Sequence, residues 1–231
     1  MNKVDKIVAL IPMRKRSLRI PDKHTRPLAG FPPALRAVNA ALGTPDIGAV
    51  YVATSTAKIR QTLKGKPVHF IPQKENEKSR TEEIVKTFCE AVQAEIIILI
   101  QATNPFVNAW HLKRALAVYK EFDPDTVISG IALQRYFYRI GCDNYINRVD
   151  SLNKSRPGVS RLSPLFVENG GFYIFKRERF LKTGSIFSDS MVAYEMPLES
   201  FFEHRLEHLL IVELAAQAGD LFVSFGDGSL Q

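Results

Sequence analysis

Basic and hydroxyl side chains gather directly behind the first apolar run of the chain. The run at 8–11 stops at Pro12, and a cluster of phosphate-binding residue types follows: Arg14, Lys15, Arg16, Ser17 and Lys23. Guanidinium and ammonium groups bind phosphate through charge-assisted hydrogen bonds. Such a cluster could hold a nucleic-acid backbone or the phosphates of one nucleotide. It could also be a solvated loop without function, so its neighbours in the fold must decide.

The first half of the chain alternates apolar runs with amphipathic segments. We expect strands at 6–12, 48–53, 67–72, 95–101 and 125–133, and helices at 33–42, 57–64, 79–93 and 108–122. This alternation predicts a three-layer α/β fold with a mostly parallel central sheet, in which the very apolar run 95–101 is central. Ligands of such sheets bind beyond the carboxyl ends of the strands. We therefore expect the site at the loops 12–23, 54–56 and 101–107.

The pattern changes at about residue 133. The next 30 or so residues lack helical periodicity and are rich in polar, aromatic and turn residues. Their aromatic content is unusual for disorder, so we expect an ordered arm at about 134–165 that meets a second subunit; a disordered loop is the alternative. Strands at 170–176 and 191–197 and a helix at 204–219 complete the prediction. We expect one domain over 1–231, with this protruding dimerisation arm.

Composition and charge limit the class of protein. The chain has 231 residues, 45% of them hydrophobic and 24% charged, and carries a net charge of +7, which suits anionic partners. The two cysteines are far apart and stand near no zinc-ligand pattern, so we expect free thiols in a reducing cytosol. A signal peptide and a membrane-spanning run are both missing, which predicts a cytoplasmic protein without a membrane partner. The aromatic and basic arm could bind single-stranded nucleic acid, but no known nucleic-acid module accompanies it.

Four motifs, in this order, resemble those of the acylneuraminate cytidylyltransferases, the CMP-sialic acid synthetase family. The loop IPMRKRSLRIPDKH at 11–24 is similar to the family's I-P-A-R-G-G-S-K-G-I-P-x-K-N, and VYVATS at 50–55 to its V-V-S-T-D segment. LIQATNPFV at 99–107 is similar to L-L-Q-P-T-S-P-L-R, and ENGGFYI at 168–174 to E-N-G-A-I-Y-I. The resemblance extends over about residues 5–218 and identifies the chain as a divergent member.

The resemblance implies a Rossmann-like nucleotidyltransferase fold and a reaction. The family transfers CMP from CTP to an acidic 3-deoxy keto-sugar, sialic acid-like or KDO-like, and releases pyrophosphate. A divalent ion, Mg²⁺ or alternatively Mn²⁺, typically assists. CTP and the acidic sugar are thus the implied partners, together with a second copy of the chain that the arm contacts. The implied setting is nucleotide-sugar and polysaccharide biosynthesis.

Roles carry over to matching positions. The implied catalytic residues are Arg14 and Lys23. The implied nucleotide-binding residues are Arg14, Lys15, Arg16, Ser17, Lys23, Thr54 and Ser55. The implied substrate-binding residues are Gln101, Thr103, Asn104 and Asn169, together with Arg161, which would meet a sugar carboxylate.

Two departures from the family leave alternatives open. Lys15, Arg16 and Arg19 stand where the family has glycines, so side-chain cations replace close backbone donors. Phe202 and His204 stand where the family has its two metal-binding Asp residues, which leaves Glu203 and His204 as candidate metal ligands or as the solvated start of a helix. One alternative is therefore a catalytically inactive homologue that binds a nucleotide, sugar or partner protein. A transferase that uses another nucleotide, such as GTP, is a second.

Overall fold

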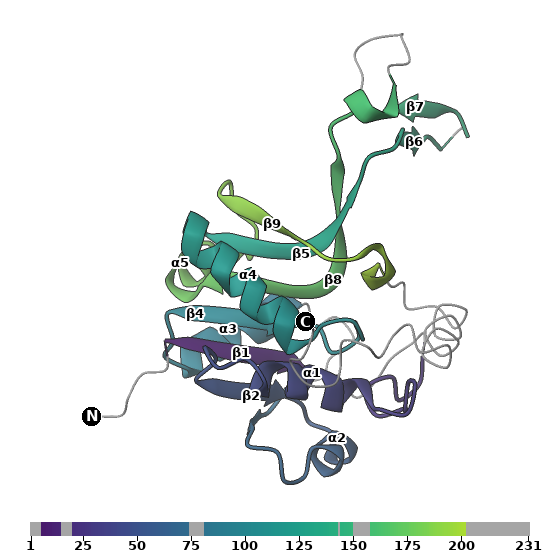
Figure 1. Cartoon of the computed structure of the whole chain (residues 1–231). Helices are drawn as coiled ribbons and strands as arrows, with labels where there is room; N and C mark the ends of the chain where they lie inside the picture. Colours follow the sequence, from purple (N-terminus) through teal and green to yellow (C-terminus); the bar gives the residue numbers. More distant parts are fainter. Residues whose placement is uncertain (1–5, 15–19, 74–80, 143, 150–157, 202–231) are drawn as a thin grey trace, which may run out of the picture.

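A seven-stranded sheet forms the centre of the computed structural model, which describes residues 6–14, 20–73, 81–142, 144–149 and 158–201 (Figure 1). Its strand order is β3-β2-β1-β4-β8-β5-β9. Only β8 runs antiparallel to its neighbours, β4 and β5. The strands are β1 (Ile7–Pro12), β2 (Ala49–Ala53), β3 (His69–Ile71), β4 (Ile96–Ile100), β5 (Thr126–Leu133), β8 (Leu165–Lys176) and β9 (Met191–Glu195). The predicted α/β class with a mostly parallel sheet is confirmed, and β4 is central as expected.

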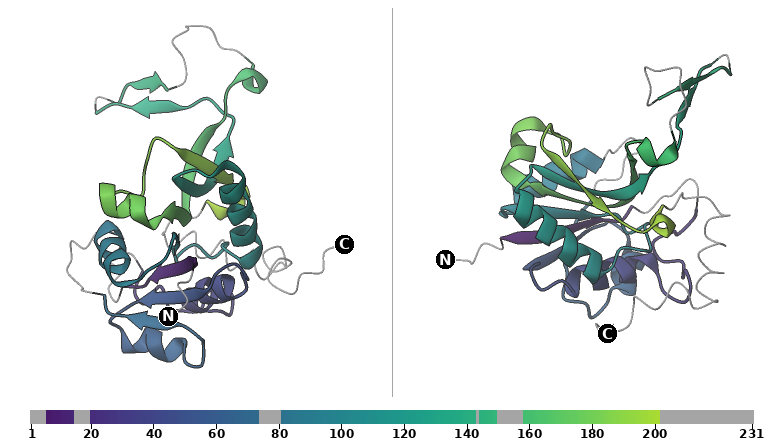
Figure 2. Two further views of the ribbon diagram at one scale, coloured as in Figure 1. Left: turned by 90° about the vertical axis from the view of Figure 1, so that its left-hand side faces the viewer. Right: turned by 45° about the horizontal axis from the view of Figure 1, so that its top comes forward.

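Helices cover both faces of the sheet and make the predicted three layers (Figure 2). One face carries α1 (Pro33–Leu42), α2 (Ala57–Thr62) and α4 (Ala109–Phe122), and the other carries α3 (Thr81–Ala91) and α5 (Arg177–Thr183). Alternate side chains of β1 enter the two hydrophobic cores, and all six residues of the strand are buried. A strand that is covered on both faces reads as a continuous apolar run, which is why the period-2 pattern is missing there.

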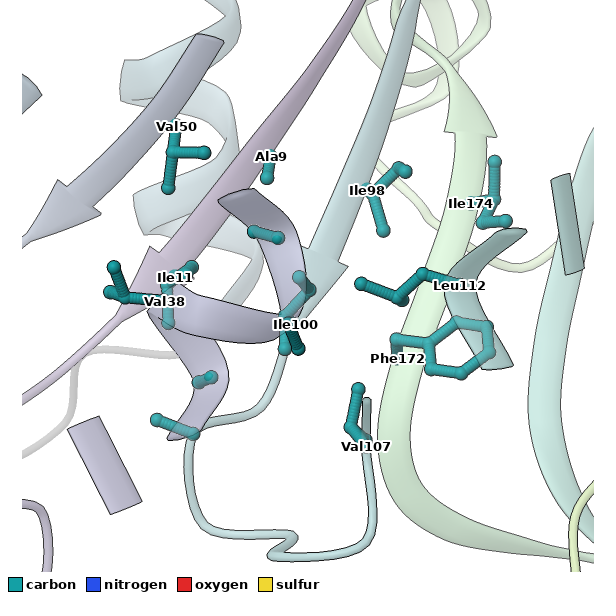
Figure 3. Close-up of a cluster of buried hydrophobic side chains, with 14 of the residues drawn as sticks. Ala9, Ile11, Val38, Val50, Ile98, Ile100, Val107, Leu112, Phe172 and Ile174 are labelled. Carbon is teal, nitrogen blue, oxygen red and sulfur yellow. The ribbon is translucent and has the colours of Figure 1, made fainter. Parts of the chain in front are cut away.

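The core beneath α1 and α4 fixes the carboxyl edge of the sheet (Figure 3). Val38 of α1 and Leu112 of α4 are fully buried in the same cluster as Ile98 and Ile100 of β4 and Phe172 of β8. Fully burying one such side chain stabilises the fold by about 1.5–3 kcal/mol. The two helices are therefore held firmly on the sheet, together with the loops that lead into them.

The segment between β5 and β8 leaves the body of the molecule (Figures 1 and 2). It contains a small hairpin, β6 (Tyr138–Ile140) with β7 (Ile146–Arg148), and the short 3₁₀ helix η1 (Val159–Arg161). Its base continues the ladder between β5 and β8, up to the pair Leu133 and Leu165. The arm predicted at about 134–165 is thus a projection, whereas its contact with a second subunit stays a prediction.

Three expectations differ from the structure or fall outside it. Strand β8 begins at Leu165, not at 170, because its first half pairs with β5 at the base of the arm. Helix α5 was not predicted, because it follows β8 directly and no turn residues mark its start. The helix expected at 204–219 lies outside the described residues; η2 (Leu198–Ser200) precedes that stretch. None of the helices in the described ranges is long and apolar enough to cross a membrane.

Candidate active site

The loops that follow β1 and β2 leave the sheet side by side. The backbone N–H of Met13 donates to the carbonyl of Ala53 at 2.8 Å, and that of Thr54 donates to Ile71 at 3.0 Å. These bonds continue the parallel pairing past the last residues of the strands. The loop with the basic cluster and the loop at 54–56 therefore start from fixed, neighbouring positions, as expected for the carboxyl edge of a parallel sheet.

A pocket opens between these two loops. Its empty volume is about 250 Å³, part of it open to solvent, and its lining consists of Arg14, Asp22, Lys23, His24, Thr25, Thr56, Lys58 and Ile59. The pocket brings together the two predicted catalytic residues, Arg14 and Lys23. The other predicted phosphate-binding residues, at 15–17, lie outside the described residues. A pocket with this many cationic side chains is suited to a polyanion.

Lys58 and Thr56 also line the pocket, and the sequence analysis missed both. Thr56 and Lys58 stand at the start of α2, two and four residues after Thr54 respectively. The sequence pattern there shows only a helix start. The Thr56 hydroxyl is buried and has no hydrogen-bond partner among the described residues. Their position after the second of two adjacent parallel strands is the signal that could have found them, because the topology places that position beside the loop after β1.

The two residues predicted in the turn after β2 differ in access. Thr54 is fully buried, and its hydroxyl oxygen accepts a hydrogen bond from the Thr56 N–H at 3.2 Å. Ser55 is exposed. Thr54 therefore shapes the turn, and the predicted contact with a nucleotide falls more naturally to Ser55.

Asn104 holds the loop after β4 from within. It is only 4% exposed, and its amide nitrogen donates to the carbonyls of Asn169 (2.8 Å) and Ser200 (3.1 Å). Its amide oxygen accepts from the Phe106 N–H at 3.0 Å. The amide predicted to meet substrate is thus occupied by the protein, whereas Gln101 and Thr103 of the same loop are half-buried.

Asn169 lies beneath that loop and has a similar arrangement. Its amide oxygen accepts from the Ser129 hydroxyl at 2.8 Å and from the Gly171 N–H at 3.0 Å. Its amide nitrogen donates to the Ser200 hydroxyl at 2.8 Å and approaches the Met196 sulfur at 3.2 Å. Asn169 was predicted to contact substrate, but its geometry is that of a buried connection between β8, β5 and η2. The resemblance drew attention to position 169, and the tertiary contacts show that its side chain forms hydrogen bonds within the protein.

The backbone around this network requires glycine and an irregular ladder. A Cβ atom at Gly171 would lie 2.8 Å from the Ser129 hydroxyl and 3.0 Å from the Asn169 amide oxygen. The ladder between β5 and β8 shifts register between Ile128 and Gly130, and there the Ser129 hydroxyl accepts the Phe172 N–H at 2.8 Å. A bulge commonly redirects a side chain in this way. The same irregularity supports the loop at 101–107, because the Gln101 N–H donates to the Gly171 carbonyl at 2.8 Å.

His111 anchors the helix that follows this loop. Asn108 caps α4, and its side-chain oxygen accepts the His111 N–H at 3.0 Å. The His111 Nδ1 lies 3.0 Å from the Tyr194 hydroxyl. Burial, aided by the charge of Arg114, lowers the pKa of His111 to about 4, and burial raises the pKa of Tyr194 to about 12. His111 is therefore neutral at pH 7, and its contacts are structural.

The remaining predicted site residues lie elsewhere. Arg161 belongs to η1 in the arm and does not line the pocket. Glu203 and His204, the candidate metal ligands, lie outside the described residues. Within the described part of the chain, no three His, Cys, Asp or Glu side chains come together as a metal site.

A mostly parallel sheet between two layers of helices, with a basic pocket at its carboxyl edge, defines the class of α/β protein whose ligands bind at that edge. A family model described as cytidylyltransferase matches residues 8–183. The chain belongs to this family, which confirms the resemblance found in its motifs.

Two relatives and one solved structure describe the likeness further. The chain is 26% identical over 205 residues to the N-acylneuraminate cytidylyltransferase of Streptococcus agalactiae serotype III, covering 84% of this chain and 49% of that protein. It is 26% identical over 196 residues to the CMP-N,N'-diacetyllegionaminic acid synthase of Legionella pneumophila subsp. pneumophila, covering 80% and 84%. The structure of CMP:2-keto-3-deoxy-manno-octonic acid synthetase complexed with CTP matches with a TM-score of 0.67 at 18% identity, covering 92% of this chain and 99% of that one. This last likeness concerns the fold alone. The chain spans about half the length of the N-acylneuraminate cytidylyltransferases that it matches.

Proposed function

We propose that the protein transfers CMP from CTP to an acidic 3-deoxy keto-sugar of the sialic acid or KDO type. The observation that carries this proposal is the basic pocket with Arg14 and Lys23 at the carboxyl edge of a cytidylyltransferase-family sheet. The names of two relatives that match most of this chain's length support the acceptor class, because one names N-acylneuraminate and the other CMP-N,N'-diacetyllegionaminic acid.

The proposed reaction is a displacement at phosphorus. The anomeric hydroxyl oxygen of the sugar forms a bond to the α-phosphorus of CTP, the bond from that phosphorus to the bridging oxygen breaks, and pyrophosphate leaves. The hydroxyl proton passes to solvent. Arg14 and Lys23 neutralise the triphosphate and the departing pyrophosphate, while Gln101 and Thr103 orient the sugar. Positioning and electrostatic stabilisation supply most of the catalysis in such reactions.

The proposal also includes a divalent cation and a second copy of the chain. Mg²⁺ or Mn²⁺ would accompany CTP, with Glu203 and His204 as candidate ligands. The arm would pair with its copy in a homodimer and bring Arg161 to the neighbouring site, where its guanidinium suits a sugar carboxylate. Exposed apolar side chains on the hairpin support this pairing: Ile140 is 71% exposed and Ile146 is 59% exposed.

The test is pyrophosphate release from CTP across a panel of nonulosonic and octulosonic acids, with Mg²⁺ or Mn²⁺ in the buffer. We expect release with one sugar class, and a loss of about 10²-fold in Arg14→Gln, because one oriented cation at the developing charge is removed. Lys64→Gln, an exposed lysine outside the pocket, is the matched control. GTP, ATP and UTP in parallel reactions test the nucleotide. CTP binding without release for every sugar would instead identify a non-catalytic relative.

A further inference from the structure

One acidic side chain stands in the otherwise basic pocket. Asp22 comes from the loop after β1, and its Oδ2 lies 2.6 Å from the Nζ of Lys58 in α2. Both side chains line the pocket together with Arg14 and Lys23, and both are a little under 60% exposed. The pair thus spans the pocket from one loop to the other, where the proposed function expects a triphosphate.

The backbone fixes the position of Asp22. Its φ is 54°, in the left-handed region that Asp adopts more readily than most other non-glycine residues. Its carbonyl accepts hydrogen bonds from the N–H groups of Thr25 (2.9 Å) and Arg26 (2.8 Å). The carboxylate is therefore placed by a tight turn, whereas Lys58 reaches it through a flexible four-carbon chain. Of the two partners, Lys58 is the one that can turn to another anion.

The energetics favour such an exchange. An ion pair between two exposed side chains contributes little in water. A polyphosphate offers more negative charge and several acceptor oxygens, and charge-assisted bonds to it are stronger than neutral ones. Thr56 caps the start of α2, two residues before Lys58, and lines the same pocket. Its buried hydroxyl has no hydrogen-bond partner within the part of the chain that the structure describes. A ligand that draws Lys58 inward would also give this hydroxyl an acceptor.

We infer that Lys58 is a further phosphate-binding residue. Its ammonium group pairs with Asp22 in the absence of ligand, and a polyphosphate displaces the carboxylate from it. The nature of the nucleotide rests on the proposed function, whereas the exchange itself requires only a polyphosphate. Asp22 then acts as a competitor within the site. Its charge opposes weak anions, while a triphosphate overcomes it, so the pair discriminates by the charge of the ligand.

A double-mutant cycle on binding tests this inference. Calorimetric titration with CTP, and separately with inorganic tripolyphosphate, is carried out without sugar on wild type, Lys58→Met, Asp22→Asn and the double variant. We expect Lys58→Met to weaken binding about tenfold, because a charge-assisted hydrogen bond is lost. Asp22→Asn should tighten binding about threefold, because an exposed ion pair no longer competes for Lys58. In the Lys58→Met background, Asp22→Asn should lose most of that gain.

The chain contains a matched control pair. Lys120 and Asp46 form another exposed ion pair, at 3.3 Å, and neither lines the pocket. Lys120→Met and Asp46→Asn carry the same charge changes and should leave both affinities unchanged. A melting curve for each variant verifies the fold, which substitution of these exposed side chains should preserve.

The outcomes separate this inference from the proposed function. Wild-type affinity in Lys58→Met, equal gains from Asp22→Asn in both backgrounds, or no binding of either ligand to wild type would each overturn the inference. Coupled effects on binding, with no pyrophosphate release for any sugar, would support the exchange and reject the proposed reaction. Pyrophosphate release together with additive effects of the two substitutions on binding would support the proposed reaction and reject the exchange.

Discussion

His111 differs from the basic side chains of the pocket in its access to solvent. Arg14 is exposed and can meet a charged ligand, whereas His111 is 7% exposed and its ring is bonded to Tyr194. Removing water from an imidazole disfavours its charged form, and the nearby Arg114 adds to the effect. The residue type alone would have allowed acid–base chemistry at position 111, but the environment excludes a protonated imidazole at neutral pH.

This environment makes the stability of the protein depend on pH. The pKa of His111 is about 4 in the folded chain and about 6.5 in an unfolded one, so the unfolded chain binds more protons between these values. The contribution of His111 is complete above pH 6.5 and falls as the pH falls towards 4, by about 3 kcal/mol in total. Urea unfolding at several pH values between 4 and 8 measures it.

The variant His111→Gln should remove that part of the pH dependence. We expect its free energy of unfolding to approach that of wild type as the pH falls. The control is Asn147→Gln, at an exposed position of β7, which carries no titratable group and should leave the profile unchanged. Parallel profiles for wild type and His111→Gln across this range would contradict the argument.

The network around Asn169 connects four elements at the carboxyl edge. Its hydrogen bonds reach β5 through Ser129, η2 through Ser200, and the loop after β4 through Asn104. Each of these groups is buried, so each depends on the others for its hydrogen bonds. This network therefore fixes the position of Gln101 and Thr103, which the proposed function assigns to binding the sugar. The side chains of the network need not touch the sugar themselves.

Removing the Asn169 side chain should lower stability. Asn169→Ala takes away the oxygen that accepts the Ser129 hydroxyl and the Gly171 N–H, and the nitrogen that donates to the Ser200 hydroxyl. We expect a loss of about 2–4 kcal/mol in the free energy of unfolding. Asn147→Ala, on the exposed hairpin, is the control and should cost less than about 0.5 kcal/mol. Urea titration compares the two. Equal stabilities would show that the network contributes nothing.

The arm presents an exposed surface on which the proposed dimer depends. A two-stranded hairpin is marginal by itself in water, and β6 and β7 carry exposed apolar side chains. Ile140 is paired with Ile146 across the hairpin, so both lie on one face, whereas Arg139 and Asn147 are paired on the other. The apolar face has no cover within the described chain, and a second copy is the proposed occupant.

Sedimentation measurements test this assembly. We expect wild type to be a dimer and Ile140→Asp to be a monomer at micromolar concentration, because a carboxylate would be buried without a partner at the interface. Asn147→Asp adds the same charge on the opposite face and should remain a dimer. A wild-type protein that is monomeric throughout would reject the proposed dimer.

Much of the architecture could be predicted from local pattern. The bounds of α1, the cap at Asn108 and the central place of β4 all follow from apolar spacing, capping chemistry and composition. The antiparallel direction of β8 could not, because the residue types and spacing of a strand do not show in which direction it runs beside its neighbours. The seven-residue α5 is too short to show a clear period.

The sequence by itself determined the alternation of strands and helices, the carboxyl-edge loops and the family. The tertiary structure alone decided which side chains meet there. Lys58 reaches Asp22 across 36 residues, Asn104 reaches Asn169 across 65, and its bond to Ser200 spans 96. Contacts between such distant residues leave no periodic trace in the chain, because they depend on strand order and on a register shift rather than on local spacing. For the same reason, the sequence did not show that Asn104 and Asn169, both predicted to bind substrate, are buried and hydrogen-bonded within the protein, or that Lys58, which belongs to no motif, lines the pocket.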